Sequence, residues 1–442
     1  MIELVIPRRV RGPVNMLRFW VAPEATIRRW AEGPAIQRVE LPGFSPFIVN
    51  DPALVDEVLV EQNRHFIKDR TTRALAELVG HGLLVSDGEF WRRQRRLAQP
   101  AFHRERIAAY AATMVEHAER LAATWRAGET IDLHAAMMRL TLDIVAATLF
   151  SSGVDAAAAD AIAESLDTIM RRFADPTYAL LPSLARLPLP GNRAFTAARA
   201  RIDATIRGLI AARRASGQDH GDLLSMLLRA RDEGGGQMTD EQLRDEALIL
   251  FVAGHETTAL ALSWTWMLLS QHPAAWARLG EELAEVLGGR APTLGDVPRL
   301  KYTEQVILES MRLYPPAWSI GREAIVDVEL GGTRIPRGGQ LWIFQWALHR
   351  HPRHFPRPEA FAPERWAGDL QRRLPRGVYL PFGGGPRLCI GNNFAMMELV
   401  LVLATLARRW RPHVRAQDRP RPQFSVTLRP AGGMRATLMR GD

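Results

Sequence analysis

The sequence predicts one mainly α-helical folding unit over residues 1–442, with a small β-rich part on its N-terminal side. Apolar residues recur three and four positions apart through most of Pro52–Arg231 and again after Thr239, which is the periodicity of amphipathic helices. Short runs of alternating and β-branched residues concentrate near residues 35–60 and 317–345. Neither an internal repeat nor a low-complexity linker separates these parts, so we expect a single domain.

Composition excludes several classes of protein. The chain has 442 residues, of which 47% are hydrophobic and 24% charged, and this balance favours a large buried core over disorder. One cysteine, Cys389, excludes a disulfide-stapled secreted scaffold. The net charge is +9, but the basic residues are dispersed among alanine and leucine, which indicates solvated helix faces and no nucleic-acid partner. No signal peptide or apolar run of about eighteen residues is present, so we expect a soluble, cytoplasmic protein without a membrane anchor.

The N-terminal half is expected to contain a short β-ribbon followed by helices. Residues 35–50 carry β-branched side chains on both sides of Pro42-Gly43, a turn pair that predicts two antiparallel strands. Two irregular stretches then interrupt the helical pattern, at Gly80–Gly88 and at Pro176–Pro190, where the prolines preclude a continuous helix. Either stretch could form the wall of a pocket or be an ordinary connection.

A long helix is predicted from Thr239 to Gln271. Thr239 and Gln242 form a capping-box start, and Pro273 ends the pattern. At 1.5 Å per residue this helix would span about 45 Å. Gly254 and the polar run His255–Thr258 interrupt its apolar interior, so this stretch needs buried partners or a functional explanation.

The C-terminal part combines short strands, a long coil and one helix. The coil, His349–Gly391, is rich in proline, arginine and glycine, and a segment of this length without secondary structure is usually functional. A last helix is expected at Asn392–Arg411. The expected strands are residues 324–330, 333–335, 340–344, 424–428 and 434–439.

Cys389 lies in the segment Phe382-Gly-Gly-Gly-Pro-Arg-Leu-Cys-Ile-Gly391, directly before the last predicted helix. The three consecutive glycines permit a tight turn and a close approach of the backbone to a bulky group. A thiolate at a helix N-terminus is stabilised by backbone N–H groups and the helix dipole. For an isolated cysteine a buried structural role would be the commoner explanation, so the neighbouring residues decide between the two.

This segment resembles the haem-binding loop of the cytochrome P450 family, Phe-x-x-Gly-x-Arg-x-Cys-x-Gly, at every defining position. Three further segments match motifs of that family in its order: Ala253-Gly-His-Glu-Thr-Thr, Glu309-Ser-Met-Arg and Pro363-Glu-Arg-Trp. With Trp91 and Arg95, the resemblance covers essentially the whole chain. It implies the P450 fold, with haem b buried between the long central helix and the helix that follows the cysteine loop.

The resemblance also implies roles for individual residues. Cys389 would be the thiolate ligand of the haem iron, which favours cleavage of the O–O bond. Thr257 would hydrogen-bond dioxygen and Glu256 would relay protons from solvent, and the family places a local helix distortion at Gly254. The other implied cofactor contacts, several of them to the propionates, are Trp91, Arg95, Ala253, Gly254, Arg322, Phe382, Arg387 and Gly391.

A charged triad is expected to stabilise the cysteine coil. Glu309 and Arg312 share a helix face and can pair, and Arg365 matches the third member of the family's triad. We assign this triad to folding and haem retention, because a buried charge that loses a partner costs several kcal/mol. Trp366 stands where many members of the family have phenylalanine, a conservative departure.

The implied activity is that of a monooxygenase that uses O2 to hydroxylate or epoxidise an apolar organic substrate. No fused reductase is expected, so electrons would come from a separate ferredoxin or flavodoxin with its reductase. Such an acidic partner would suit the arginines at positions 92, 93, 96, 372, 373 and 376.

Substrate class follows less directly from the sequence. The expected pocket walls are apolar, which favours a fatty acid or terpenoid, with a steroid or polyketide possible. Two alternatives stay open: a peroxide-driven peroxygenase or decarboxylase, which usually lacks the acid–alcohol pair, and a non-catalytic haem sensor, which needs no proton relay. The candidate walls are residues 83–85, 173–184, 250–253, 317–320 and 426–428.

Overall fold

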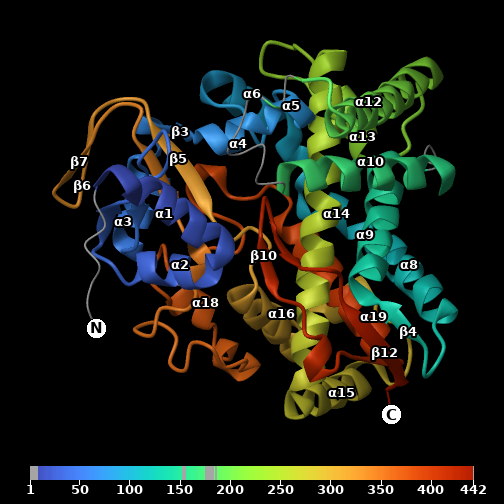
Figure 1. The fold of residues 1–442 in the computed structure, drawn as a ribbon. Helices are drawn as coiled ribbons and strands as arrows, with labels where there is room; N and C mark the ends of the chain where they lie inside the picture. Colours follow the sequence, from blue (N-terminus) through green and yellow to red (C-terminus); the bar gives the residue numbers. More distant parts are fainter. Residues whose placement is uncertain (1–7, 152–155, 175–183, 185–186, 442) are drawn as a thin grey trace. The chain divides into compact units, whose positions relative to one another are not determined.

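The computed structural model describes the chain except for residues 1–7, 152–155, 175–183, 185–186 and 442 (Figure 1). The chain forms two compact units. The smaller one, the sheet unit, comprises Met1–Leu75, Ala317–Ala360 and Gly368–Cys389. The larger one, the helical unit, comprises Ala76–Pro316, Phe361–Ala367 and Ile390–Asp442. Helices dominate, as predicted, and the single domain expected over residues 1–442 stays a prediction.

The sheet unit is organised around a five-stranded sheet with the order β1-β2-β8-β5-β3. The predicted ribbon is confirmed, because β1 and β2 pair antiparallel with Ile36 opposite Val49. β2 and β8 pair in parallel, and the other neighbours are antiparallel. The strands are β1 (Ile36–Arg38), β2 (Phe47–Val49), β3 (Phe66–Lys68), β5 (Ile320–Ala324) and β8 (Gln340–Ile343).

The predicted strand over residues 324–330 is wrong. The chain instead leaves β5 after Ala324 and forms a separate hairpin of β6 (Val328–Leu330) and β7 (Thr333–Ile335). The Asp327 carboxylate, directly before β6, accepts a hydrogen bond from the backbone N–H of Arg337, which follows β7, at 2.9 Å. This contact joins the two ends of the hairpin.

The core of the sheet unit lies where apolar strand residues meet a helical segment. Val55 of α3 (Pro52–Asp56) and Leu59 of the π-helical turn η1 (Glu57–Glu61) belong to the same buried cluster as the apolar side chains of the strands. The N-terminal helices α1 (Arg8–Val21) and α2 (Pro23–Ala31), which the sequence analysis did not predict, contribute an aromatic cluster in which Trp30 stacks on Phe344 with ring centroids 6.0 Å apart. The remaining helices of the unit are α4 (Arg70–Ala74), α17 (Gln345–Leu348) and α18 (Leu370–Arg373).

The helical unit is organised around α14 (Asp240–Gln271), which lies against α9 (Leu133–Phe150) along much of its length (Figure 1). The predicted capping box is confirmed: Gln242 N–H donates to Thr239 Oγ1, and Thr239 N–H donates to Gln242 Oε1. The other main helices are α6 (Gly88–Ala98), α8 (Ala111–Thr124), α10 (Ala156–Ala174), α12 (Pro190–Ser216), α13 (Leu223–Arg229), α15 (Pro273–Leu287), α16 (Lys301–Leu313) and α19 (Asn392–Ala407).

The last helix is shorter than predicted. α19 ends at Ala407, and Trp410 begins strand β9 (Trp410–His413), whose partner is β12 (Arg435–Arg440). Trp410 is buried, and its indole N–H donates to Ala122 O at 3.0 Å. Tertiary packing therefore overrides the helical periodicity that continues through Trp410. A second hairpin, β10 (Pro422–Phe424) and β11 (Leu428–Pro430), follows.

Two further sequence expectations can be compared with the described residues. Gly80–Gly88 contains the irregular connection that was predicted, between α5 (Ala76–Val79) and α6. Most of Pro176–Pro190 falls outside the described residues. Among the residues that are described, α9 and α14 are long and apolar enough to cross a membrane, but 61% and 72% of these segments are buried in the protein, as in core helices.

Candidate active site

The centre of α14 exposes a face of small side chains. Ala253 is exposed and Gly254 and Thr257 are half-buried, although Phe251, about three turns after the start of α14, is fully buried. Ala253 and Thr257 are four residues apart and therefore share one face of the helix. Such a face lets a flat, bulky ligand approach the helix backbone closely.

Three consecutive carbonyl groups on α14 each accept a hydrogen bond from a hydroxyl. Thr257 Oγ1 donates to Ala253 O at 2.7 Å, and Thr258 Oγ1 donates to Gly254 O at 3.0 Å. Thr141 Oγ1 of α9 donates to the carbonyl of His255 at 2.9 Å. The helix runs through this stretch without a break, and the local distortion that the family resemblance implied stays a prediction. The extra acceptor contacts are of the kind that weaken backbone bonds and bend helices.

Two residues of this stretch have packing roles. A Cβ atom at Gly254 would lie 3.2 Å from Val145 Cγ2, so glycine permits the close approach of α9. The His255 side chain is buried, and burial lowers the pKa of its imidazole to about 4, which keeps it neutral. The absence of a ligand role for His255 stays a prediction.

Glu256 is held by residues from the C-terminal hairpin. Its side chain is 4% exposed, and its Oε1 atom accepts hydrogen bonds from Arg429 Nη2 at 2.6 Å and Nε at 2.8 Å. Thr427 Oγ1 donates to the same oxygen at 2.5 Å. Neither partner could be predicted from the sequence, because both lie more than 170 positions further along the chain and no local pattern marks them.

The cysteine loop of the sheet unit is folded by its own backbone. Cys389 N–H donates to Phe382 O at 3.0 Å, and Leu388 N–H donates to Gly385 O at 3.0 Å. The thiol side chain of Cys389 is exposed. Gly385 has a φ of 65°, and a Cβ atom there would lie 2.0 Å from the carbonyl oxygen of Leu59. Glycine is therefore required for the loop to pack on η1.

A buried histidine supports the start of this loop. His349 is fully buried, and its Nε2 atom accepts a hydrogen bond from the backbone N–H of Leu380 at 2.8 Å. Because Nε2 accepts, the ring proton is on Nδ1 in the neutral tautomer. His349 was not among the predicted site residues, although its position at the start of the long coil was a usable signal.

The predicted cofactor contacts are divided between the two units. The sheet unit contains Cys389, Phe382, Arg387 and the buried Arg322, whose Nη1 donates to Gly321 O at 2.8 Å. In the helical unit, Arg95 is half-buried on α6 and donates through Nε to Gln99 Oε1 at 2.9 Å. That unit also contains the predicted cofactor contacts Trp91, Ala253, Gly254 and Gly391, together with the predicted catalytic residues Glu256 and Thr257.

The predicted triad is present in the helical unit and is more extensive than expected. The fully buried Glu309 carboxylate accepts hydrogen bonds from Arg312 Nε at 2.8 Å and from Arg365 Nε at 2.9 Å. The indole N–H of Trp366 and the backbone N–H of Ala362 each donate to it at 2.9 Å. A phenylalanine at position 366 could not donate, so the departure noted in the sequence adds a hydrogen bond to the triad.

A family model described as Cytochrome P450 matches residues 33–435. The chain belongs to the cytochrome P450 family. It is 44% identical to the cyclooctatin synthase of Streptomyces melanosporofaciens, over 86% of this chain and 83% of the relative. The cyclooctat-9-en-7-ol 5-monooxygenase of the same species is 39% identical, with coverages of 91% and 94%.

Other comparisons agree with this assignment. The pentalenene oxygenase of Streptomyces avermitilis is 34% identical, over 88% of this chain and 87% of the relative. The solved structure entitled "Crystal structure of cytochrome P450DA heme domain" superimposes with a TM-score of 0.86 and is 28% identical, with coverages of 96% and 95%. The fold and the oxidoreductase class predicted from the sequence are thereby confirmed.

The residues of this P450 fit the haem-thiolate cofactor that the family implies. An exposed thiol in a loop folded by backbone hydrogen bonds suits a soft metal ligand. The small, exposed side chain of Ala253 suits close contact with a planar macrocycle, and a cofactor contact of Gly254, whose open side faces α9, stays a prediction. Arg322 and Arg387 supply cationic donors for carboxylates of such a group.

Proposed function

We propose that this P450 is a haem b monooxygenase that hydroxylates or epoxidises a terpenoid, using O2 and electrons from a separate protein donor. The observation that carries the substrate class is the group of relatives at 34–44% identity, whose names refer to cyclooctatin and pentalenene, both terpenoids. The sequence alone favoured fatty acids and terpenoids equally, and these relatives favour terpenoids.

Haem b, held through the Cys389 thiolate, would supply the activation of dioxygen and the oxidation of the substrate C–H or C=C bond. Arg322, Arg387 and Arg95 would hold its propionates, with Trp91 beside Arg95 on α6. These contacts orient the group, and the backbone amides of the cysteine loop would donate to the sulfur and tune its basicity.

Thr257 and Glu256 would manage protons. The Thr257 hydroxyl donates to Ala253 O at 2.7 Å, and a rotation about its Cα–Cβ bond would redirect this donor toward dioxygen. Glu256 would hold and transfer a proton at its carboxylate. Both residues lie on α14, whose central face of small side chains leaves room beside them for the reacting molecules.

Apolar side chains would bind the substrate and exclude water. In the helical unit, Leu84 is 36% exposed and Val426 is 39% exposed, although both are large hydrophobic residues. Both belong to segments predicted as pocket walls, residues 83–85 and 426–428. A terpenoid skeleton offers the matching apolar surface. The predicted wall at residues 173–184 falls mostly outside the described residues.

The electron donor would be an acidic ferredoxin or flavodoxin that binds exposed arginines. Arg93 and Arg96 were candidates, but they pair with Asp232 and Glu233 within the chain, which reduces the positive potential that they present. Arg373 and Arg376, at and after the end of α18, are exposed and better suited. We therefore favour the region of α18 for docking and regard a cytoplasmic location as part of the proposal.

The proposed function can be tested by spectroscopy and turnover. Protein purified after growth with iron and a haem precursor should give a thiolate-type difference spectrum when reduced under carbon monoxide, and Cys389→Ser should abolish it. A panel of cyclic sesquiterpene and diterpene hydrocarbons and alcohols should include compounds that displace the water ligand and yield an oxygenated product with a surrogate [2Fe–2S] ferredoxin, its reductase and NADPH. Displacement by fatty acids alone would overturn the substrate class, and turnover with peroxide alone would favour a peroxygenase.

A further inference from the structure

The contact between Glu256 and the C-terminal hairpin uses only one carboxylate oxygen. Arg429 Nε, Arg429 Nη2 and Thr427 Oγ1 all donate to Glu256 Oε1, at 2.8, 2.6 and 2.5 Å. An arginine that binds a carboxylate side by side commonly uses both oxygens. Among the described residues none donates a hydrogen bond to Glu256 Oε2, and this atom is absent from the buried polar atoms that lack a partner. Oε2 is therefore not completely buried, although the side chain as a whole is only 4% exposed.

The hairpin that carries these donors is fixed to α14 and to the segment after α16 by the backbone of Leu428. Leu428, between Thr427 and Arg429, accepts a hydrogen bond through its carbonyl from Trp264 Nε1 at 3.0 Å. Its N–H donates to Pro316 O at 2.9 Å. Trp264 is fully buried and lies on α14, two turns beyond Glu256. The positions of Thr427 and Arg429 relative to Glu256 are thus set by a buried contact next to them.

Arg429 supplies the positive charge beside Glu256. Two histidines lie close enough to interact electrostatically with this pair, His255 on α14 and His134 on α9. Burial lowers the pKa of each imidazole to about 4, with Arg429 also lowering that of His134, so both are neutral near pH 7. The ion pair is consequently between Glu256 and Arg429, with a neutral hydroxyl from Thr427.

We infer that Arg429 and Thr427 are positioning residues for the proposed proton relay, because they bind Glu256 Oε1 and leave Oε2 as the oxygen that carries the proton. This inference rests on the proposed function of Glu256. Fixing one oxygen orients the other, so a proton leaves and reaches the carboxylate at a single defined atom. Without Arg429 the carboxylate would rotate among several orientations, and reducing equivalents would be lost as hydrogen peroxide instead of appearing in product.

The test measures product formed per NADPH oxidised, with the terpenoid that gives the largest spectral shift and the surrogate ferredoxin system. Arg429→Gln and Thr427→Val should lower this ratio several-fold, and Arg429→Lys, which keeps the charge but not the paired donors, should fall between Arg429→Gln and the native enzyme. The solvent deuterium isotope effect on product formation should rise from the native enzyme through Arg429→Lys to Arg429→Gln. Arg421→Gln is the matched control, because Arg421 is an exposed arginine directly before β10.

The double variant Glu256→Gln/Arg429→Gln shows whether Arg429 acts by positioning Glu256 or has an effect that is independent of Glu256. If Arg429 acts through Glu256, the double variant should have the same ratio as Glu256→Gln alone. The inference is overturned if Arg429→Gln matches Arg421→Gln, or if Arg429→Gln lowers the ratio by the same factor in both backgrounds.

Equilibrium unfolding in urea tests the same contact without turnover. The midpoint shifts of Glu256→Gln and Arg429→Gln should be clearly non-additive in the double variant, and additive shifts would overturn the inference. Failure of the proposed function looks different: the native protein would lack the carbon monoxide band or form no oxygenated product. In that case the unfolding cycle still decides whether Arg429 holds Glu256.

Discussion

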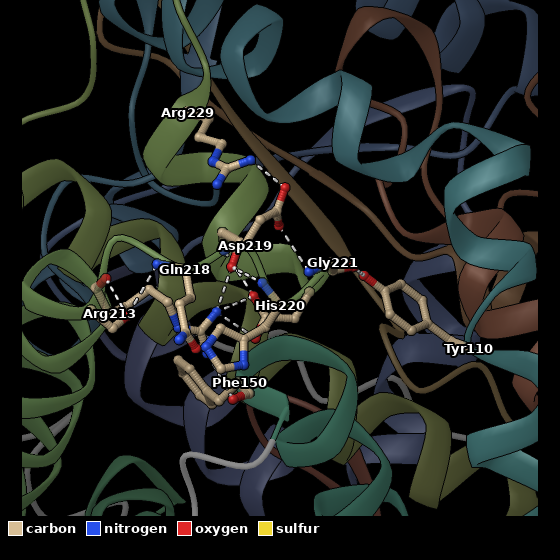
Figure 2. A network of polar contacts seen from close by, with 11 residues as sticks. Tyr110, Phe150, Arg213, Gln218, Asp219, His220, Gly221 and Arg229 are labelled. Atoms are coloured by element: carbon tan, nitrogen blue, oxygen red, sulfur yellow. Dashed lines mark hydrogen bonds and ion pairs between the residues drawn. The ribbon is translucent and has the colours of Figure 1, made fainter.

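Arg213 of α12 donates through Nη1 to both carboxylate oxygens of Asp222, at 2.6 and 2.7 Å, and both side chains are buried. Figure 2 shows the surrounding network, in which Arg213 Nη2 also donates to the carbonyl of Phe150 at the end of α9, at 3.1 Å. Asp222 caps α13 by accepting from Ser225 N–H at 2.8 Å. One ion pair therefore connects the ends of three helices in the helical unit.

Breaking this ion pair should destabilise the helical unit strongly. Arg213→Met leaves the buried Asp222 carboxylate without its cation, and we expect the free energy of unfolding to fall by about 3–5 kcal/mol. The exposed pair Arg229–Asp219 of the same network is the control, and Arg229→Met should cost less than about 1 kcal/mol. Urea unfolding measures both, and equal losses would contradict the prediction.

Trp366→Phe should weaken the buried triad. The substitution removes the indole donor to Glu309 Oε2, which lies 2.9 Å away, and leaves Arg312 as the donor to that oxygen. We expect a loss of about 1–2 kcal/mol in unfolding free energy, beyond the effect of the smaller ring. Trp266→Phe is a matched control, because Trp266 is equally buried and its indole N–H makes no hydrogen bond among the described residues. A larger loss in Trp266→Phe would refute this account.

Gly385→Ala should disrupt the cysteine loop and reduce haem content. The new Cβ atom would lie 2.0 Å from Leu59 O, and the positive φ of 65° adds backbone strain. Gly383→Ala carries a similar strain, with a φ of 76°, but its Cβ atom would meet no atom within 4 Å. The ratio of Soret to protein absorbance after purification should fall much further in Gly385→Ala, and equal ratios would show that the clash is unimportant.

Glu246 should make stability depend on pH. Burial raises the pKa of this carboxyl to about 7, although the backbone N–H of Leu83 donates to its Oε2 at 3.1 Å and favours the ionised form. A raised pKa means that the folded protein binds the proton more tightly than the unfolded chain does. The resulting contribution of Glu246 to the free energy of unfolding is fully present below about pH 4.5 and is lost as the pH rises through about 7.

Glu246→Gln tests the predicted loss of stability with rising pH. Glutamine cannot ionise and can still accept from Leu83, so the variant should gain stability relative to the native protein between pH 5 and pH 8, by up to about 3 kcal/mol. Glu285→Gln, at an exposed position on α15, should retain the native pH profile. The raised pKa of Glu246 would be contradicted if the stability of the native protein rose between pH 5 and pH 8. It would also be contradicted if the stability of Glu246→Gln changed with pH in parallel with that of the native protein.

Sequence patterns predicted the elements whose signals are local. The start of α14 was correct because a capping box involves residues three positions apart, and the β1–β2 ribbon was correct because its turn residues and alternation lie within one short segment. The end of α19 was wrong because Trp410 continues the helical period but is buried in a sheet. Helices α1 and α2 were both missed, and within α1 Gly12 and Pro13 are residues that usually interrupt helices.

The linear order of residues was sufficient to identify the family, the candidate thiolate Cys389 and the pair Glu256–Thr257, because these features consist of residue types at short, fixed spacings. Only the tertiary structure revealed that Arg429 binds Glu256 and that Trp366 binds Glu309. The physical reason is distance along the chain: these partners are 173 and 57 positions apart, and their contact depends on how the intervening segments fold back, which no local pattern of side chains records.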